Sequence, residues 1–340
     1  MSYLFRSDYQ ELAHPRIIKA LEKYSLEQNV PYGLDYHSSN AAELIKNIFN
    51  AKEAAVHFLA GGTQANMVLI SSCLKHYEGV IACKSGHINV HETAAVEGAG
   101  YKIITYEGKN GKLHKEDVLK ALKDNVDVHM VKPRMVYISN STECGTIYSK
   151  QELLDLHEVC KKNDLYLFID GARIGSALTC KENDVDPSLL GEVADAFYVG
   201  GTKNGLLYGE ALVIVNKELQ KDFYYHVKNK GAMLAKGYSL GIQFEEAFKD
   251  GLYFELAKHA NDIADYIKEA LIELNIETLP SPTNQIFVEF KRDISLDLIK
   301  VFGLEKWEDK DETIIVRIVT SFNTSKENAD ELISYIKEIL

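Results

Sequence analysis

Two apolar segments of the sequence end on residues that could take part in catalysis. Residues 166–169 (YLFI) run into Asp170, and residues 196–199 (AFYV) run into Gly-Gly-Thr and then Lys203. Ligands of open parallel sheets bind beyond the carboxyl ends of the strands, so we expect a site near Asp170. A lysine in a crowded pocket loses its proton readily enough to act as a nucleophile, and the glycines around Lys203 leave room for a bulky planar partner. The plainer interpretations are a helix-capping aspartate and a solvated loop lysine.

A third segment could bind a phosphate group. Residues 54–59 form a short apolar run, which is followed by Gly61, Gly62 and Thr63 and then by a helical pattern to about residue 76. Glycines let an anion approach the backbone, and the free N–H groups at the start of a helix, with the Thr63 hydroxyl, would hold a phosphate. The same Gly-Gly-Thr sequence is also an ordinary turn and cap. The sequence has neither Walker A spacing around Lys203 nor a G-x-G-x-x-G after the first strand, which argues against P-loop and nicotinamide-binding folds.

The elements that must position these residues alternate between short apolar runs and helical segments. We predict strands at 54–59, 80–82, 101–105, 134–138, 166–169, 196–199 and 211–215, with helices at 41–50 and 63–76 among the segments between them. Short continuous apolar runs suit strands buried on both faces of a sheet. The predicted fold class is α/β with a mostly parallel central sheet, to which the two strands on either side of Lys203 contribute an antiparallel member.

The pattern changes after about residue 248. A long helical stretch at 253–274 is followed by alternating runs at 284–290 and 313–319 and by a closing helix from residue 325. This order is typical of a small α+β domain. We therefore predict two parts: residues 1–248, with the N-terminal segment and the large domain, and residues 249–340, the small C-terminal domain.

Composition excludes several classes of protein. The 340 residues include 38 Lys and Arg against 50 Asp and Glu, a net charge of −12, which argues against a nucleic-acid binder. No stretch of 18 uncharged residues suggests a membrane span, and MSYLFRSDYQ at the start lacks the apolar run of a signal peptide, so we expect a soluble cytoplasmic protein. The five cysteines form no C-x-x-C pair, which indicates reduced packing residues and neither a disulfide framework nor a metal site.

Taken together, the chemical motifs resemble the large domain of fold-type I pyridoxal-phosphate enzymes. Within them the sequence is most similar to the threonine aldolase and β-eliminating lyase group, which includes low-specificity L-threonine aldolases. The shared motifs, in chain order, are Arg-Ser-Asp at 6–8, Gly-Thr-x-Ala-Asn at 62–66, His-x-x-x-x-Glu at 87–92, Asp-Gly-Ala-Arg at 170–173, Lys203, and Val-Arg-Ile-Val-Thr at 316–320. The resemblance covers nearly the whole chain. It implies a fold-type I large domain, a small α+β domain and pyridoxal 5′-phosphate as cofactor.

The resemblance also implies roles in cofactor binding. Lys203 would form the Schiff base with the cofactor, and Asp170 would pair with the pyridinium nitrogen and keep it protonated. His87 would stack on the ring, with His91 as the competing candidate. The phosphate would lie on the amides of Gly62 and Thr63. Lys236, in a segment that often serves the partner subunit in this family, is a further candidate cation or else a surface lysine.

Substrate binding calls for a planar donor to the α-carboxylate, which is arginine. Arg173 and Arg317 match family positions for this role, with Arg173 also facing the cofactor, and Ser7 matches a hydroxyl donor near the amino terminus. An arginine inside the apolar run 314–319 is hard to explain by packing, which favours a functional Arg317.

The reaction implied is retro-aldol cleavage of a small β-hydroxy-α-amino acid, such as L-threonine or L-allo-threonine, to glycine and acetaldehyde. Many threonine aldolases carry a histidine near the substrate hydroxyl, whereas the aligned position here is Glu143. The base is therefore open among Glu143, His91 and a water molecule. Alternatives are a β-eliminating lyase or an aminotransferase that uses the same cofactor, or a relative without catalytic activity. The resemblance also implies a homodimer or homotetramer with shared active sites, in which the loop 32–36 could face a neighbour's cofactor.

Overall fold

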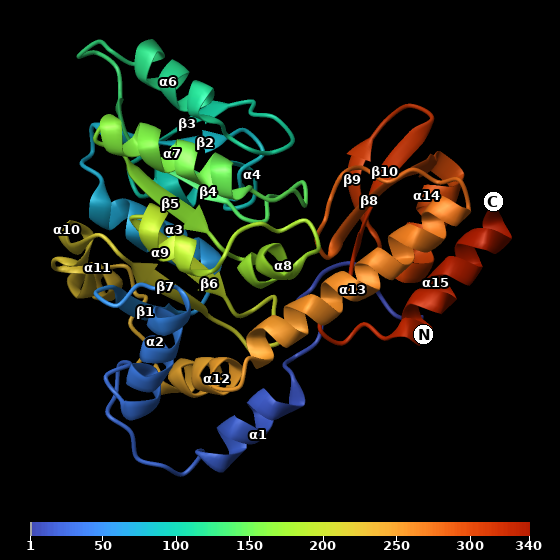
Figure 1. Cartoon of the computed structure of the whole chain (residues 1–340), viewed down its shortest axis with the longest axis horizontal. Helices are drawn as coiled ribbons and strands as arrows, with labels where there is room; N and C mark the ends of the chain where they lie inside the picture. The colour runs from blue at the N-terminus through green and yellow to red at the C-terminus, as the bar shows by residue number, and fades with distance from the viewer. Residues whose placement is uncertain (1) are drawn as a thin grey trace.

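The computed structural model describes residues 2–340, which form two sheets and the helices around them (Figure 1). The larger sheet has seven strands in the order β1-β7-β6-β5-β4-β2-β3. Its strands are β1 (Ala55–Leu59), β2 (Glu78–Cys83), β3 (Lys102–Tyr106), β4 (Lys132–Ser139), β5 (Tyr166–Asp170), β6 (Ala196–Gly200) and β7 (Glu210–Ile214). Strands β6, β5, β4, β2 and β3 are parallel, and β7 is antiparallel to both β6 and β1. The predicted α/β class is confirmed, including the antiparallel pair on either side of Lys203.

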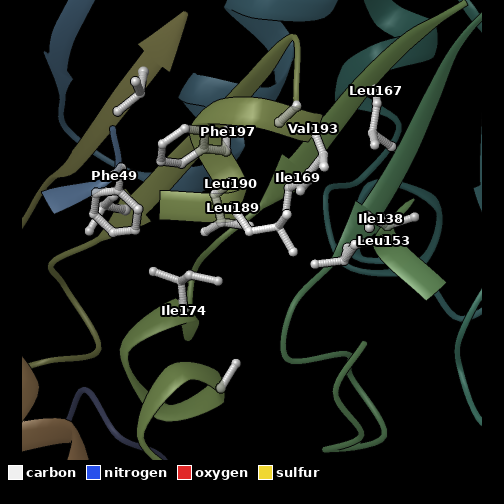
Figure 2. Packing of buried hydrophobic residues seen from close by; sticks show 14 of the residues in the cluster. Phe49, Ile138, Leu153, Leu167, Ile169, Ile174, Leu189, Leu190, Val193 and Phe197 are labelled. Carbon is white, nitrogen blue, oxygen red and sulfur yellow. The ribbon is translucent and has the colours of Figure 1, made fainter. Parts of the chain in front are cut away.

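Both faces of this sheet are buried, as the continuous apolar runs predicted. Alternate residues of β6 point to opposite sides, so that Phe197 packs in one hydrophobic core and Tyr198 in the other. Figure 2 shows the first core, where Phe197 and Ile169 pack against Leu190 of α9 and against Ile174. The helices that supply residues to this core include α2 (Tyr36–Ile48), α6 (Lys115–Asp124), α7 (Lys150–Lys162), α8 (Ile174–Thr179), α9 (Ser188–Val193) and α12 (Tyr238–Phe248).

The opposite face of the sheet is covered by helices that include α3 (Gly62–Cys73), α5 (Ala95–Gly98) and α11 (Phe223–Asn229). Three further helices belong to this part of the chain: α1 (Pro15–Lys23), α4 (His87–Val90) and α10 (Lys217–Gln220). The helix at the predicted phosphate turn, α3, is separated from the end of β1 by two residues, with Gly61 as a cap residue that has no side-chain hydrogen bond. Its first N–H groups therefore have no intrahelical acceptors.

The second sheet is antiparallel, with the order β8-β10-β9. It is built from β8 (Gln285–Lys291), β9 (Glu305–Asp309) and β10 (Thr313–Val319), with α14 (Arg292–Phe302) and α15 (Lys326–Ile339) around it. The long helix α13 (Leu252–Glu273) leads from the large sheet to this smaller one (Figure 1). The sequence predicted β8, β10, α13 and α15, and it missed α14 and β9.

The N-terminal segment packs against the smaller sheet. The Phe5 side chain is fully buried in the core of that sheet. The Phe5 amide donates to the Phe302 carbonyl at 2.9 Å, and the Val319 amide donates to the Phe5 carbonyl at 2.9 Å. The N-terminal segment therefore packs with the smaller sheet before the chain continues to the larger one. The predicted domain boundary after residue 248 stays a prediction. Within residues 2–340, no helix has the length and apolar character needed to cross a bilayer.

Candidate active site

A cavity of about 280 Å³ opens at the carboxyl ends of the parallel strands. Asp170 ends β5, Ser139 ends β4, and Lys203 follows β6 in the loop to β7. This is the edge at which ligands of parallel sheets bind. The cavity is lined by Tyr9, His87, His91, Ser139, Ser141, Glu143, Asp170, Ala172, Arg173, Lys203, Glu305 and Arg317.

Asp170 is fixed by donors from three elements. The Tyr137 hydroxyl donates to Oδ2 at 2.5 Å, and the Tyr198 hydroxyl donates to Oδ1 at 2.5 Å. The Asn66 amide adds a longer bond to Oδ2 at 3.2 Å. Burial and the nearby Asp170 charge raise the pKa of both tyrosines well above the ordinary value, so the hydroxyls remain donors. The carboxylate is thereby held in one orientation, as the partner of a cationic ring nitrogen would need to be.

His87 lies in the short helix α4, and its ring is held by Glu92. The distance between His87 Nδ1 and Glu92 Oε1 is 2.8 Å, and Asn66 donates to the same oxygen at 2.7 Å. Burial alone would lower the pKa of His87, but the bond to Glu92 and the charge of Asp170 outweigh it and raise the pKa. The His91 ring lies 5.5 Å from the His87 ring, and burial together with His87 lowers the pKa of His91. Both histidines therefore line the cavity, and their surroundings shift their pKa values in opposite directions.

Glu143 lies beside His87 in the loop after β4. Its Oε1 atom accepts from the Ser139 hydroxyl at 2.8 Å and from the His87 amide at 3.0 Å. Burial and the charge of Asp170 raise the pKa of Glu143. A carboxyl group whose pKa lies above its ordinary range can exchange a proton nearer neutral pH, which is what a general base requires.

Lys203 lies in a loop whose glycines admit no side chain. A Cβ on Gly200 would lie 2.3 Å from the Ala172 carbonyl oxygen, and one on Gly201 would lie 2.6 Å from that of Gly209. Burial and the charge of Arg173 lower the pKa of Lys203. The loop thus brings a partly buried amine of lowered pKa to the cavity, and its role as a nucleophile stays a prediction.

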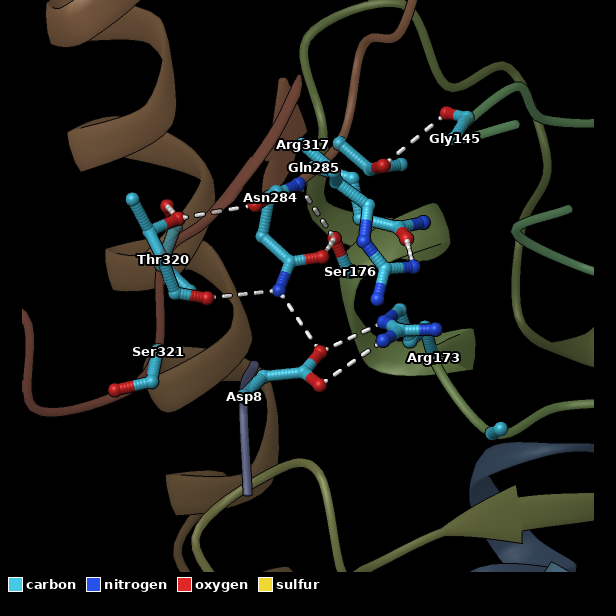
Figure 3. Close-up of polar contacts among 12 residues, drawn as sticks. Asp8, Gly145, Arg173, Ser176, Asn284, Gln285, Arg317, Thr320 and Ser321 are labelled. Atoms are coloured by element: carbon cyan, nitrogen blue, oxygen red, sulfur yellow. Dashed lines mark hydrogen bonds and ion pairs between the residues drawn. The ribbon is translucent and has the colours of Figure 1, made fainter. Parts of the chain in front are cut away.

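Arg173 makes a two-pronged ion pair with a buried aspartate of the N-terminal segment. Its Nε atom donates to Asp8 Oδ2 at 2.7 Å and its Nη2 atom donates to Oδ1 at 3.0 Å, as Figure 3 shows. Asn284 also donates to Asp8 Oδ2, at 3.0 Å. This cluster joins the N-terminal segment, the large sheet and the start of β8 directly beside the cavity.

Arg317 reaches the cavity from β10. Its Nη1 atom donates to Gln285 Oε1 at 3.0 Å, its Nη2 atom pairs with Glu305, and its guanidinium lies 5.5 Å from the Trp307 ring centre. Figure 3 shows its guanidinium above that of Arg173, and burial together with the Arg173 charge lowers the pKa of Arg317. Two guanidinium groups therefore lie at one wall of the cavity, and arginine is the side chain that pairs best with a carboxylate.

Comparison with known proteins identifies the family. A family model described as beta-eliminating lyase matches residues 5–292. The chain belongs to the beta-eliminating lyase family. The family resemblance predicted from the motifs is confirmed.

The relatives of this lyase are similar over nearly their whole length. A threonine aldolase from Leishmania major superposes with a TM-score of 0.97 and 41% identity, over 99% of both chains. The low specificity L-threonine aldolase of Pseudomonas sp. (strain NCIMB 10558) is 31% identical over 294 residues, 85% of this chain and 84% of its own. An aspartate aminotransferase from Thermus thermophilus, with a TM-score of 0.70 and 15% identity over 100% of this chain and 92% of its own, shares the fold alone.

Most of the predicted site residues of this lyase line one cavity, and four do not. Lys203, Asp170, His87, Glu143, His91, Arg173 and Arg317 all line it. Gly62 is connected to the cavity through Tyr198, whose hydroxyl donates to Asp170 and would lie 2.8 Å from a Cβ at Gly62. Thr63 is exposed on the first turn of α3, Ser7 is buried beside Asp8, and Lys236 is exposed in the loop before α12. The roles of all these predicted site residues, inside and outside the cavity, stay predictions.

Sequence reasoning did not single out several residues that shape this lyase's site. Tyr137 and Tyr198 stood inside apolar strands, where a tyrosine is an ordinary core residue, although a buried hydroxyl needs a partner and so gave a weak signal. Asp8 and Glu92 were noted only as letters of family motifs. Glu305 gave no signal, because it begins a short polar segment.

Proposed function

We propose that this protein is a pyridoxal-phosphate-dependent lyase that cleaves β-hydroxy-α-amino acids between Cα and Cβ, taking L-threonine or L-allo-threonine to glycine and acetaldehyde. Its family membership and its similarity to proteins named threonine aldolase support this function. The observation on which the proposal rests most is one cavity that holds a fixed carboxylate, an amine of lowered pKa and two arginines.

The residues present fit the cofactor. Among the described residues, two buried polar atoms of the cavity wall, Ser141 Oγ and Arg317 Nε, have no hydrogen-bond partner, as expected where a polar ligand completes the site. Asp170 would pair with the ring nitrogen, His87 would contact the ring face, and Lys203 would attach the aldehyde carbon. The amides of Gly62 and Thr63 at the start of α3 would hold the phosphate. Lys236 is proposed as an additional cation for the phosphate.

The protein residues then determine which bond of the substrate breaks. When bound, pyridoxal phosphate supplies an electron sink for the pair of electrons released at Cα. Arg173 and Arg317 would bind the α-carboxylate, with Ser7 as a further donor. These contacts would fix the orientation of the bonds at Cα. Holding the Cα–Cβ bond in the reactive orientation directs cleavage to that bond.

Cleavage also requires a base for the β-hydroxyl proton, and we propose Glu143. Its Oε1 atom is occupied by Ser139 and His87, whereas Oε2 makes no hydrogen bond to any residue in 2–340. This oxygen would accept the hydroxyl proton, and the raised pKa of Glu143 suits the transfer. His91 is the second candidate, because it lines the same cavity and its lowered pKa keeps it neutral near pH 7.

We further propose a cytoplasmic homodimer or homotetramer in which neighbouring subunits complete each other's sites. The loop between α1 and α2 and the first residue of α2 expose several large apolar side chains: Leu26, Val30, Tyr32, Leu34 and Tyr36. Tyr9, at the cavity, is also more than half exposed. Apolar side chains gathered on one surface are typical of a protein interface.

The function is tested by aldehyde release from L-threonine and L-allo-threonine by the cofactor-loaded enzyme. We expect glycine and acetaldehyde from the wild type and none from Lys203→Ala, which would also lose the visible absorbance of the attached cofactor. Ammonia with a keto acid would instead indicate β-elimination, and a pyridoxamine product would indicate transamination. Either result from a loaded enzyme would contradict the proposed reaction.

A further inference from the structure

Glu305 lines the cavity but has no role in the proposed reaction. It begins β9 and stands directly opposite Arg317 in the register of β9 and β10. Opposite charges at facing positions of two antiparallel strands attract each other. The two side chains form an ion pair in which Arg317 is buried and Glu305 is 39% exposed. Arg317 is therefore fixed in the cavity wall, whereas Glu305 borders both solvent and the cavity.

The contacts of the Arg317 guanidinium show what a ligand carboxylate would meet. Gln285 accepts from Nη1 at 3.0 Å, Glu305 takes Nη2, and Nε is buried without a partner in the described chain. A carboxylate that binds arginine with both oxygens uses two neighbouring N–H groups, here Nε and Nη2. It would find Nε free and Nη2 taken by Glu305.

We propose that Glu305 is an internal competitor for the substrate carboxylate, which must displace it from Arg317. This inference rests on the proposed function, in which Arg317 binds the α-carboxylate. Glu305 can leave at modest cost because its side chain is already 39% exposed. Arg317 does not move with it, because Gln285 and the face of Trp307 hold the guanidinium independently.

The competitor lowers the affinity of the site for every carboxylate, so that only ligands with further contacts bind well. Without a ligand, Glu305 keeps the buried guanidinium paired, which avoids an uncompensated buried charge. A simple anion that offers only a carboxylate gains from Arg317 little more than Glu305 already supplies. An amino acid, which also reaches Lys203 and Arg173 in the same cavity, gains enough to displace it. Glu305 therefore weakens both kinds of ligand, and acetate, which makes fewer other contacts, no longer binds at concentrations at which an amino acid does.

A built-in reporter allows this exchange to be followed. Trp307 is the single tryptophan of the chain, and it lies two residues from Glu305 with its ring 5.5 Å from the Arg317 guanidinium. Displacement of Glu305 changes the charge next to the indole, so its fluorescence should respond to carboxylate binding. The titration is made on the cofactor-loaded enzyme with glycine, the product, and separately with acetate.

The decisive variant is Glu305→Gln, with Glu308→Gln as the matched control on the same strand. Glu308 is exposed, lies opposite Ile315 after the register shift in β9, and is not among the residues that line the cavity. We expect Glu305→Gln to bind glycine about fivefold more tightly and to lower KM for L-threonine by the same factor, with kcat unchanged, since the pair is half-exposed. Acetate should bind measurably more tightly to this variant as well. Glu308→Gln should match the wild type.

Two further variants separate competition by Glu305 from a purely structural contribution of its side chain. Glu305→Ala, which removes every acceptor, should tighten glycine binding at least as much as Glu305→Gln. In an Arg317→Gln background, the Glu305→Gln change should have no effect on glycine binding. An unchanged or weaker glycine affinity in Glu305→Gln would overturn the proposal and make Glu305 a positioning residue for Arg317. Failure of the proposed function would look different, because glycine would bind and no aldehyde would be released from threonine.

Discussion

The hydroxyl oxygen of Tyr198 lies 2.8 Å from the position that a Cβ on Gly62 would take. The same hydroxyl donates to Asp170 Oδ1 at 2.5 Å. One tyrosine thus connects the first residue of α3, where we propose that the phosphate binds, with the carboxylate proposed to hold the ring nitrogen. The space available at residue 62 and the orientation of the Asp170 carboxylate are therefore coupled through Tyr198.

The coupling predicts the effect of adding one methyl group. Gly62→Ala should displace the Tyr198 hydroxyl from Asp170 and weaken binding of pyridoxal phosphate about tenfold, because a hydrogen bond to a charged group is lost. Cofactor affinity is measured by titrating the apoprotein and following visible absorbance. Gly61→Ala is the control, since a Cβ there has no atom within 4 Å. Equal affinities of the two variants would contradict the coupling.

The fold was predictable where burial leaves a continuous apolar run. Strands such as β6 and β7 are buried throughout, so their composition alone marked them. The strand β9 was missed because it is a polar edge strand, with the sequence EKWED and no buried residue. The helix α14 was missed because it begins at Arg292, directly after β8 ends at Lys291, without a turn to mark the boundary.

The site was predictable only for residues that stand out from their own segment. Asp170 and Arg317 are charges in apolar strands, and such charges need a reason. The partners of these residues come from other strands: Tyr137 reaches Asp170 across the β4–β5 pair, and Glu305 faces Arg317 across the β9–β10 pair. The register between neighbouring strands determines these pairs. Register cannot be predicted from each segment of a single sequence taken separately.

The buried ion pair of Asp8 and Arg173 should contribute strongly to stability. The side chains are 1% and 10% exposed, so Asp8→Asn leaves a buried guanidinium without its counter-charge. We expect the free energy of unfolding to fall by about 3 kcal/mol, measured by urea denaturation of the cofactor-loaded enzyme. Despite its burial, Arg173 holds the pKa of Asp8 below its ordinary 3.8. The contribution is therefore present above that pH and is lost as the pH falls further.

A surface pair provides the control for this prediction. Asp250 pairs with Arg16 at 3.0 Å, and its side chain is 64% exposed. Asp250→Asn removes the same charge from a solvated pair, so its unfolding curve should lie close to that of the wild type. If Asp8→Asn were no more destabilising than Asp250→Asn, the Asp8 pair would have no structural role.

Because Glu210 is buried, we expect the free energy of unfolding to decrease as the pH rises. Glu210 lies at the start of β7, where its Oε2 atom accepts from the Gly201 amide at 3.0 Å, and burial raises its pKa from 4.5 to about 8. A raised pKa means that folding favours the protonated form. The contribution is full below about pH 4.5 and is lost as the pH rises through about 8.

The variant Glu210→Gln keeps an acceptor for the Gly201 amide and cannot ionise. Its melting temperature should therefore fall less than that of the wild type between about pH 5 and pH 9, and the gap between the two should widen as the pH rises. Calorimetry of both proteins at matched ionic strength measures this gap. Parallel curves would show that Glu210 does not titrate in this window.

Glu143 should determine the acid limb of the pH–rate profile. A base must be unprotonated to accept the hydroxyl proton, so kcat/KM should fall as the pH drops through the pKa of Glu143, which burial and Asp170 raise above its ordinary range. Glu143→Gln, with the same shape and no basic oxygen, should lower kcat by about 100-fold or more and remove that limb, with cofactor absorbance unchanged. His91→Asn is the matched comparison, because His91 lines the same cavity. If His91→Asn removed the limb and Glu143→Gln retained it, the proton would be assigned to His91.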